Sequence, residues 1–178
     1  MDMLEKIRRL IELSAGEFER IDMAMIAHLD GTRCMLKAWG AREALQQAGL
    51  FHRAYTQRLV KDRQFISQNQ RRLIAEVVGA ESESIIYHYC ACDRERFFNS
   101  LLQQDAPQYV DRFTQVQCHI TPQLLNDLCE LFVATELEFA SDQRARHSLR
   151  DASIRRFLTQ LSPYLSRGAN NKVRQLLA

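Results

Sequence analysis

Residues 18–28 read FERIDMAMIAH, and this stretch indicates how the chain folds. Phe18, Ile21, Met25 and His28 follow one another at steps of three or four residues, which place them on one face of a helix. Similar spacing returns in the segments 1–13, 64–78, 81–104, 121–135 and 148–161. We therefore predict an all-α protein whose helices turn their apolar faces towards a shared core.

The length of 178 residues is enough for one domain with its own core. We find no internal repeat, low-complexity tract or linker, so a single domain over residues 1–178 is expected. Six glycines and three prolines force few turns, which favours helices over a many-stranded sheet protein. Segment 105–120, which contains Pro107, is expected to be a loop or a short hairpin.

The charge pattern limits the partners and the compartment. A net charge of +2 does not indicate nucleic-acid binding, and no apolar run approaches the length of a membrane span. The first residues carry charges throughout and lack the apolar region of a secretory signal, so we expect a cytoplasmic protein. The odd number of cysteines, five, then indicates reduced thiols.

Three polar residues stand out on or beside the predicted apolar faces. His28 lies on the stripe described above, His52 follows the short helix 41–49, and Asp93 falls on the predicted inner face of helix 81–104. A carboxylate on an inner face needs a partner. Two imidazoles and one carboxylate suit a divalent metal such as Mn, Fe or Zn. We therefore predict a mononuclear metal site at His28, His52 and Asp93.

Each of these residues also has a purely structural interpretation. His28 fits a hydrogen-bonded core histidine, His52 fits a helix-end cap, and Asp93 fits a buried ion pair with Arg94 or Arg96. If a metal is bound, its water can act as a nucleophile near neutral pH, whereas the same ligands on iron support oxygen chemistry. The sequence leaves these alternatives open.

The order of the motifs resembles the HD-domain superfamily, most closely the hydrolase domains of the alarmone enzymes. The residues that carry the resemblance are His28, the stretch AGLFH at 48–52 and the stretch CDR at 92–94. The resemblance covers roughly residues 18–100 and implies an HD-like helical bundle with a metal at His28, His52 and Asp93. The stretch FHRAY at 51–55 is also similar to a smaller group of HD-like proteins in which a non-acidic residue and then a tyrosine follow Phe-His.

Two departures from the family pattern bear on the reaction. Arg53 stands where the family has its second carboxylate, so a two-metal centre is not expected. Thr56 and Gln57 stand where the alarmone hydrolases have an acidic pair, and neither can act as a general base. Arg53 turned inwards would meet an anionic group, and turned outwards it would be a surface residue. Tyr55 is a candidate for orienting a substrate or donating a proton.

These observations lead to one expected function and two alternatives. The expected function is a metal-dependent enzyme that acts on a small anionic molecule, most simply by hydrolysing a phosphoester. Its metal ligands would be His28, His52 and Asp93, and its catalytic residues Arg53 and Tyr55, with Arg94 as a second candidate for meeting the anion. The alternatives are a catalytically silent binding module on an HD-like fold and a mononuclear non-haem iron oxygenase.

Overall fold

Helices dominate the computed structural model, which describes residues 3–13, 23–55, 66–101, 108–141 and 152–177. The prediction of an all-α protein is confirmed, since the only sheet among these residues is one short hairpin. In chain order the elements are α1 (Met3–Leu13), α2 (Met23–Ala38), α3 (Glu43–Phe51), η2 (Gln68–Gln70), α4 (Arg71–Val78), α5 (Ala80–Ala91), α6 (Arg94–Leu101), β1 (Gln108–Val110), β2 (Gln117–His119), α7 (Pro122–Ser141), α8 (Ala152–Gln160), η4 (Ser162–Tyr164) and α9 (Arg167–Leu177). Within the described ranges, no helix combines the length and apolar character needed to cross a membrane.

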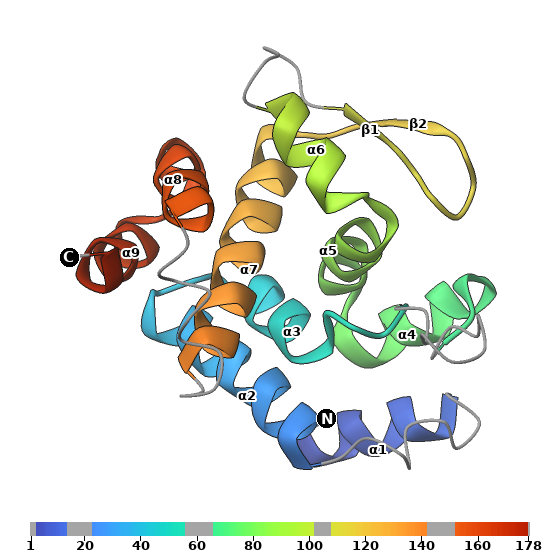
Figure 1. Ribbon diagram of the computed structural model, residues 1–178. Coiled ribbons are helices and arrows are strands. Elements are labelled where there is room, and N and C mark those ends of the chain that lie inside the picture. Colours follow the sequence, from blue (N-terminus) through green and yellow to red (C-terminus); the bar gives the residue numbers. More distant parts are fainter. Residues whose placement is uncertain (1–2, 14–22, 56–65, 102–107, 142–151, 178) are drawn as a thin grey trace.

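The core forms where α2, α3, α5 and α7 pack against one another (Figure 1). Leu36, Ile86 and Leu131, from three of these helices, are fully buried there. The small residues of α3 allow α2 to approach closely: a Cβ added at Gly49 would lie only 2.6 Å from Cδ1 of Leu36. This close approach of α2 and α3 brings the ends that carry the two candidate histidines side by side.

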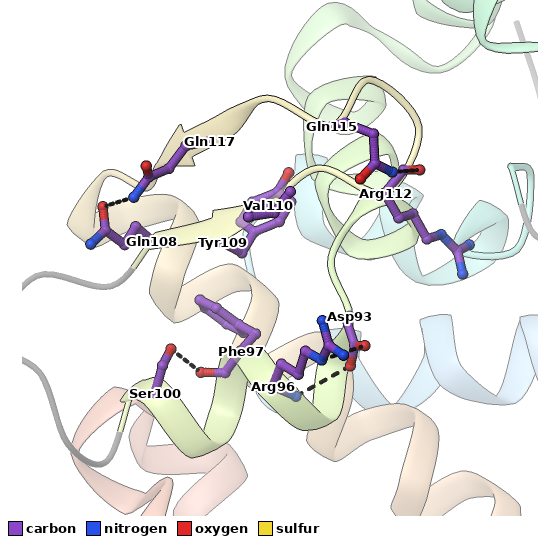
Figure 2. A pocket seen from close by; sticks show the side chains of 10 residues that line it. All are labelled: Asp93, Arg96, Phe97, Ser100, Gln108, Tyr109, Val110, Arg112, Gln115 and Gln117. Atoms are coloured by element: carbon purple, nitrogen blue, oxygen red, sulfur yellow. Dashed lines mark hydrogen bonds and ion pairs between the residues drawn. The ribbon is translucent and has the colours of Figure 1, made fainter.

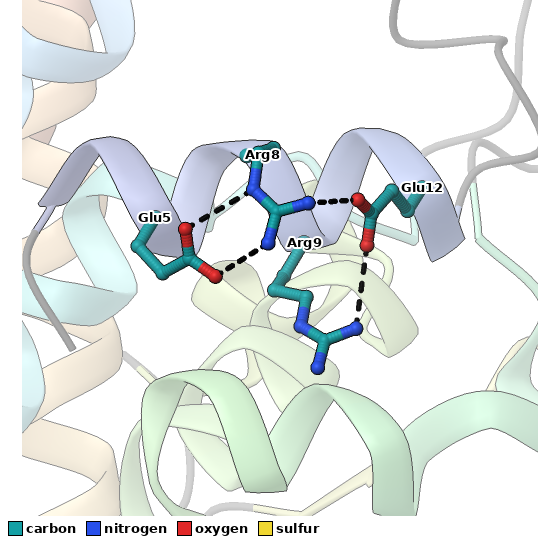
Figure 3. Close-up of polar contacts among 4 residues, drawn as sticks. All are labelled: Glu5, Arg8, Arg9 and Glu12. Atoms are coloured by element: carbon teal, nitrogen blue, oxygen red, sulfur yellow. Dashed lines mark hydrogen bonds and ion pairs between the residues drawn. The ribbon is translucent and has the colours of Figure 1, made fainter.

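The remaining helices surround this core. Helices α8 and α9 lie on the side of α7 that faces away from α5, and the hairpin and α1 lie at opposite ends of the molecule (Figure 1). On α1, Arg8 bonds Glu5 and Glu12, and Arg9 also reaches Glu12 (Figure 3). Exposed pairs of this kind contribute little to stability, because water and salt screen the charges.

The predicted helix 81–104 is interrupted, and this is the main correction to the expected fold. Helix α5 ends at Ala91, Cys92 has extended backbone angles, and α6 begins at Arg94. The backbone N–H of Arg96 donates to Asp93 Oδ1 at 3.2 Å, so Asp93 caps the start of α6 as aspartates commonly do. Asp93 therefore lies on the surface, and the prediction that it occupies an inner helix face is wrong.

Other boundaries follow the sequence more closely. The predicted loop or hairpin contains β1 and β2, which pair antiparallel with Tyr109 opposite Cys118. Helix α7 begins at Pro122 as expected, with the N–H of Leu124 donating to Thr121 Oγ1. Thr56 and Gln57, which stand in place of the acidic pair of the alarmone hydrolases, lie outside the described residues.

Candidate functional site

The structure brings together two of the three predicted metal ligands. His28 comes from α2 and His52 from the residue that ends α3, and their ring centres lie 5.2 Å apart in an edge-to-face arrangement. Both line a pocket of about 300 Å³ together with Arg53, Tyr89, Arg94 and three residues of α7. The ring of Tyr89 continues the cluster at 5.6 Å from that of His52.

Both imidazoles are held through the same nitrogen. Nδ1 of His52 donates to the carbonyl oxygen of Gly49 at 2.8 Å, and Nδ1 of His28 contacts Oε2 of Glu138 on α7. Since a carbonyl or a carboxylate accepts but does not donate, we assign the ring proton to Nδ1 in each case. In the neutral form of each ring, Nε2 is then the nitrogen that carries the lone pair. Nε2 of His52 has no hydrogen-bond partner among the described residues.

Burial keeps His52 neutral. The side chain is almost fully buried, and loss of hydration lowers the pKa of His52 to about 3. The bond to the Gly49 carbonyl opposes this shift, while the neighbouring His28 and the positive charge of Arg53 reinforce it. His52 therefore presents an uncharged imidazole that can accept a hydrogen bond at neutral pH.

Two guanidinium groups border the imidazoles. Arg53 is half-buried and turns inwards, since its Nη1 lies 3.6 Å from Sδ of Met25. Nη1 of Arg94 donates to the hydroxyl of Tyr89 at 3.1 Å, and its guanidinium lies 5.4 Å from the centre of that ring. Within the part of the chain that the structure describes, neither arginine forms an ion pair with a carboxylate. An anion that enters the pocket would therefore not have to displace a described carboxylate from either arginine.

Helix α7 supplies the opposite wall. Thr135 Oγ1 donates to the carbonyl of Phe132 and lies 3.0 Å from the Tyr89 hydroxyl, while Phe139 stands at the pocket with its side chain largely exposed. The carboxyl of Glu136 is half-buried, and burial raises its pKa more than Arg94 and His28 lower it. The pocket thus combines a neutral base with a carboxyl group that holds its proton more tightly than usual.

Sequence reasoning missed the carboxylates of α7. Glu136 and Glu138 lie in the stretch LFVATELEFA at 131–140, where every other residue except Thr135 is apolar. Two acids in such a stretch indicate partners for buried positive or polar groups. The sequence does not say which partners they are, because His28 and Glu138 are 110 residues apart.

Asp93, the third predicted ligand, faces a different pocket. It lies between α6 and the hairpin, beside Arg96, in a pocket of about 360 Å³ (Figure 2). Its Oδ2 is 3.6 Å from Nε of Arg96, and about half of its side chain is exposed. Asp93 therefore pairs with Arg96, but the alternative interpretation of a buried ion pair is wrong about the burial, since both side chains are exposed.

The residues present fit a metal only in part. Two imidazoles bound to one ion at about 2.1 Å with a near-tetrahedral angle would have ring centres about 5 Å apart, close to the observed separation. Among the described residues, however, no three histidine, cysteine or acidic side chains are grouped closely enough to hold a metal ion. The predicted set of His28, His52 and Asp93 is not assembled, so these residues do not form a three-ligand metal site.

Tyr55, the other predicted catalytic residue, does not reach the pocket. Its side chain is fully buried, and its hydroxyl donates to Oε1 of Glu83 at 2.7 Å. Glu83 also accepts bonds from Nε and Nη2 of Arg71. Burial raises the pKa of Tyr55, which further suits a structural hydrogen-bond donor. The position of Tyr55 therefore corrects the prediction that it touches a substrate.

Comparison with known proteins gives one similarity. The model of a family described as a domain of unknown function (DUF6817) matches residues 9–94. No curated protein and no solved structure matches the chain. The matched stretch contains both histidines, Arg53 and Arg94, and it ends before α7. The α7 wall of the pocket thus lies outside the region of similarity.

Proposed function

We propose that this chain is an enzyme that hydrolyses a small phosphoester in the pocket of His28 and His52. One observation carries the proposal: two imidazoles, each held through Nδ1, lie beside two guanidinium groups that form no ion pair with a described carboxylate. Arginine suits the planar oxygen pairs of a phosphate group, and imidazole is the commonest side chain for proton transfer at neutral pH.

The roles follow from the contacts. Arg53 and Arg94 hold the anionic oxygens of the substrate. His28 takes the proton of the attacking water at Nε2, and Glu138 stabilises the imidazolium that forms, as a carboxylate does behind a catalytic histidine. His52, which stays neutral, accepts a hydrogen bond from the water and orients it.

The leaving group needs a proton, and Glu136 is the side chain that supplies it. Water attacks phosphorus, its proton passes to His28, the bond from phosphorus to the ester oxygen breaks, and the ester oxygen leaves with the proton of Glu136. The products are an alcohol and a phosphate. The raised pKa of Glu136 supports this role, because a general acid must still carry its proton near working pH.

A relation to the HD-domain superfamily belongs to the same proposal. The order of His28, His52 and Asp93 and the all-α architecture support it. The exposed position of Asp93 and the arginine at position 53 speak against the metal chemistry of that superfamily. The iron-oxygenase alternative needs the same three ligands and has the same weakness.

A binding module remains the second candidate, and Arg53 favours it. An inward-facing arginine beside the histidine pair strengthens anion binding whether or not a reaction follows. This candidate predicts phosphate binding without turnover.

The test uses p-nitrophenyl phosphate and bis(p-nitrophenyl) phosphate as substrates and inorganic phosphate as the binding probe. Protein treated with a chelator is assayed alone and with added Mn²⁺, Fe²⁺ or Zn²⁺. We expect turnover of at least one ester and a loss of about 100-fold or more in His28→Gln, with weaker phosphate binding in Arg53→Gln and Arg94→Gln. Arg96→Gln and His119→Asn, which change exposed residues outside the pocket, are the matched controls.

The outcomes separate the candidates. Phosphate binding that depends on Arg53 and Arg94, without turnover under any metal condition, would favour the binding module. Turnover that requires a metal and disappears in Asp93→Ala would restore the three-ligand site and contradict the roles of His28 as base and Glu136 as acid. If the protein neither binds phosphate nor turns over an ester, both candidates are refuted.

A further inference from the structure

Glu138 reaches His28 across the packing interface of α2 and α7. The two side chains meet through Oε2 and Nδ1, and each is only 18 % exposed. A largely buried carboxylate beside an imidazole holds the ring in one orientation and fixes which nitrogen carries the proton. The contact therefore controls the state of His28 from a helix far away in the sequence.

Gly31 makes room for this contact. It follows His28 by three residues and so lies on the same face of α2. A Cβ added at Gly31 would lie 2.7 Å from Oε1 and 2.9 Å from Cγ of Glu138, well inside the normal contact distance of about 3.5 Å. The space that a side chain at position 31 would occupy is thus filled by Glu138.

Helix stability does not account for a glycine at this position. Gly31 lies inside α2, where glycine is less favourable than alanine, and it is not among the glycines with a positive φ. The close approach of Glu138 is the feature of this site that favours a glycine, because a Cβ here would push the side chain of Glu138 away from its observed position.

From this geometry we infer that Gly31 and Glu138 form a positioning pair, which keeps the proton of His28 on Nδ1 and leaves Nε2 as the base. Both are positioning residues, because they act through His28 and not on the substrate. The effect on catalysis rests on the proposed function, whereas the effect on the tautomer of His28 does not.

The first measurement is nitrogen NMR of protein labelled with ¹⁵N-histidine, with the His28 signals identified by their loss in His28→Gln. In the wild type we expect a protonated Nδ1 and an unprotonated Nε2. In Gly31→Ala and in Glu138→Ala we expect this preference to be lost, with both tautomers present. Glu76→Ala, which removes an exposed glutamate of α4, is the control and should leave the His28 signals unchanged.

Thermal unfolding separates positioning from structural damage. The atoms that a Cβ at position 31 would meet belong to a flexible side chain, which can move aside. Gly31→Ala should therefore unfold at the wild-type temperature or higher, since alanine favours the helix. If Gly31→Ala removes the preference of His28 for a proton on Nδ1 but keeps the wild-type unfolding temperature, a purely structural role of the glycine is excluded.

The double variant provides the sharpest test. If Gly31 acts only through Glu138, Gly31→Ala has no further effect once Glu138→Ala is present, for the tautomer or for the rate. If the proposed hydrolysis holds, each single variant lowers kcat by about 10- to 100-fold and the double variant lowers it no further.

Failure of the positioning pair and failure of the proposed hydrolysis give different results. An altered tautomer in a protein without turnover supports the positioning pair and refutes the proposed function. A wild-type tautomer in Glu138→Ala overturns the inference altogether. A wild-type tautomer in Gly31→Ala alone removes Gly31 from the pair. If Gly31→Ala fails to fold, Glu138→Ala still decides the role of the carboxylate.

Discussion

Replacing His52 with asparagine should make the stability of the protein much less sensitive to pH. The folded protein holds His52 neutral, because burial lowers its pKa from 6.5 to about 3. In the unfolded chain the same imidazole takes up a proton as the pH falls through about 6.5. Asparagine has no proton to exchange in this range, and its side-chain N–H can still donate to the carbonyl of Gly49.

The sign and size follow from proton linkage. Above the unfolded pKa both states are neutral at His52, so the stabilisation is fully present. As the pH falls from 6.5 towards about 3, the unfolded state binds the extra proton, and stability is lost progressively. Between about pH 7.5 and about pH 5 this single group should cost about 2 kcal/mol of unfolding free energy.

Urea denaturation at the two pH values measures the effect. The quantity of interest is the drop in unfolding free energy of the wild type minus the drop in His52→Asn, so that contributions from other titrating groups cancel. We expect this difference to be about 2 kcal/mol, in protein treated with a chelator. His119→Asn removes an exposed imidazole and is the control for losing a histidine elsewhere. Equal drops in the wild type and His52→Asn would refute a buried, neutral His52.

Three further predictions test the framework around the pocket. Glu83→Ala leaves the buried Tyr55 hydroxyl and a guanidinium without their acceptor and should cost about 3 kcal/mol in urea denaturation; a cost near zero would contradict a structural role. Asp93→Ala should leave the Kd for inorganic phosphate unchanged in calorimetry. It should lower the free energy of unfolding by about 1 kcal/mol, because the cap of α6 is lost. Weaker phosphate binding would show that Asp93 contributes to the pocket of His28 and His52. Gly168→Ala would place a Cβ 2.5 Å from the carbonyl oxygen of Trp39 and should cost about 2 kcal/mol, visible as a lower Tm; an unchanged Tm would mean that the contact relaxes freely.

The sequence predicted those features of the fold that depend on neighbouring residues. Met25 and His28, the described part of the predicted stripe, lie in α2, and α7 begins within the predicted segment 121–135. Each of these signals is complete within one or two helical turns. His28 and His52 lie close together because the small residues of α3 allow α2 to approach closely.

The errors arise where local patterns compete or where distant segments meet. Apolar periodicity continues across Cys92 and Asp93, so it hides the break between α5 and α6. The preference of aspartate for the N-cap was the competing signal, and at Asp93 it determines the structure. The contact of Glu138 with His28 gave no local signal, since only the packing of α7 on α2 selects one glutamate among many.

Two parts of the chain build the pocket, and only one of them matches the family model. Residues 9–94, which match the family model, supply both histidines and both arginines, and so contain the groups that would bind an anion. Helix α7 lies beyond this stretch and supplies the carboxyl groups of Glu136 and Glu138, which would move and hold protons. In the proposed reaction, anion binding would depend on residues 9–94, whereas proton transfer would need His28 from this stretch together with the carboxyl groups of α7. Another chain that matches only residues 9–94 would be expected to share the anion-binding groups. It would be expected to share the reaction only if it also places carboxylates beside the residue equivalent to His28.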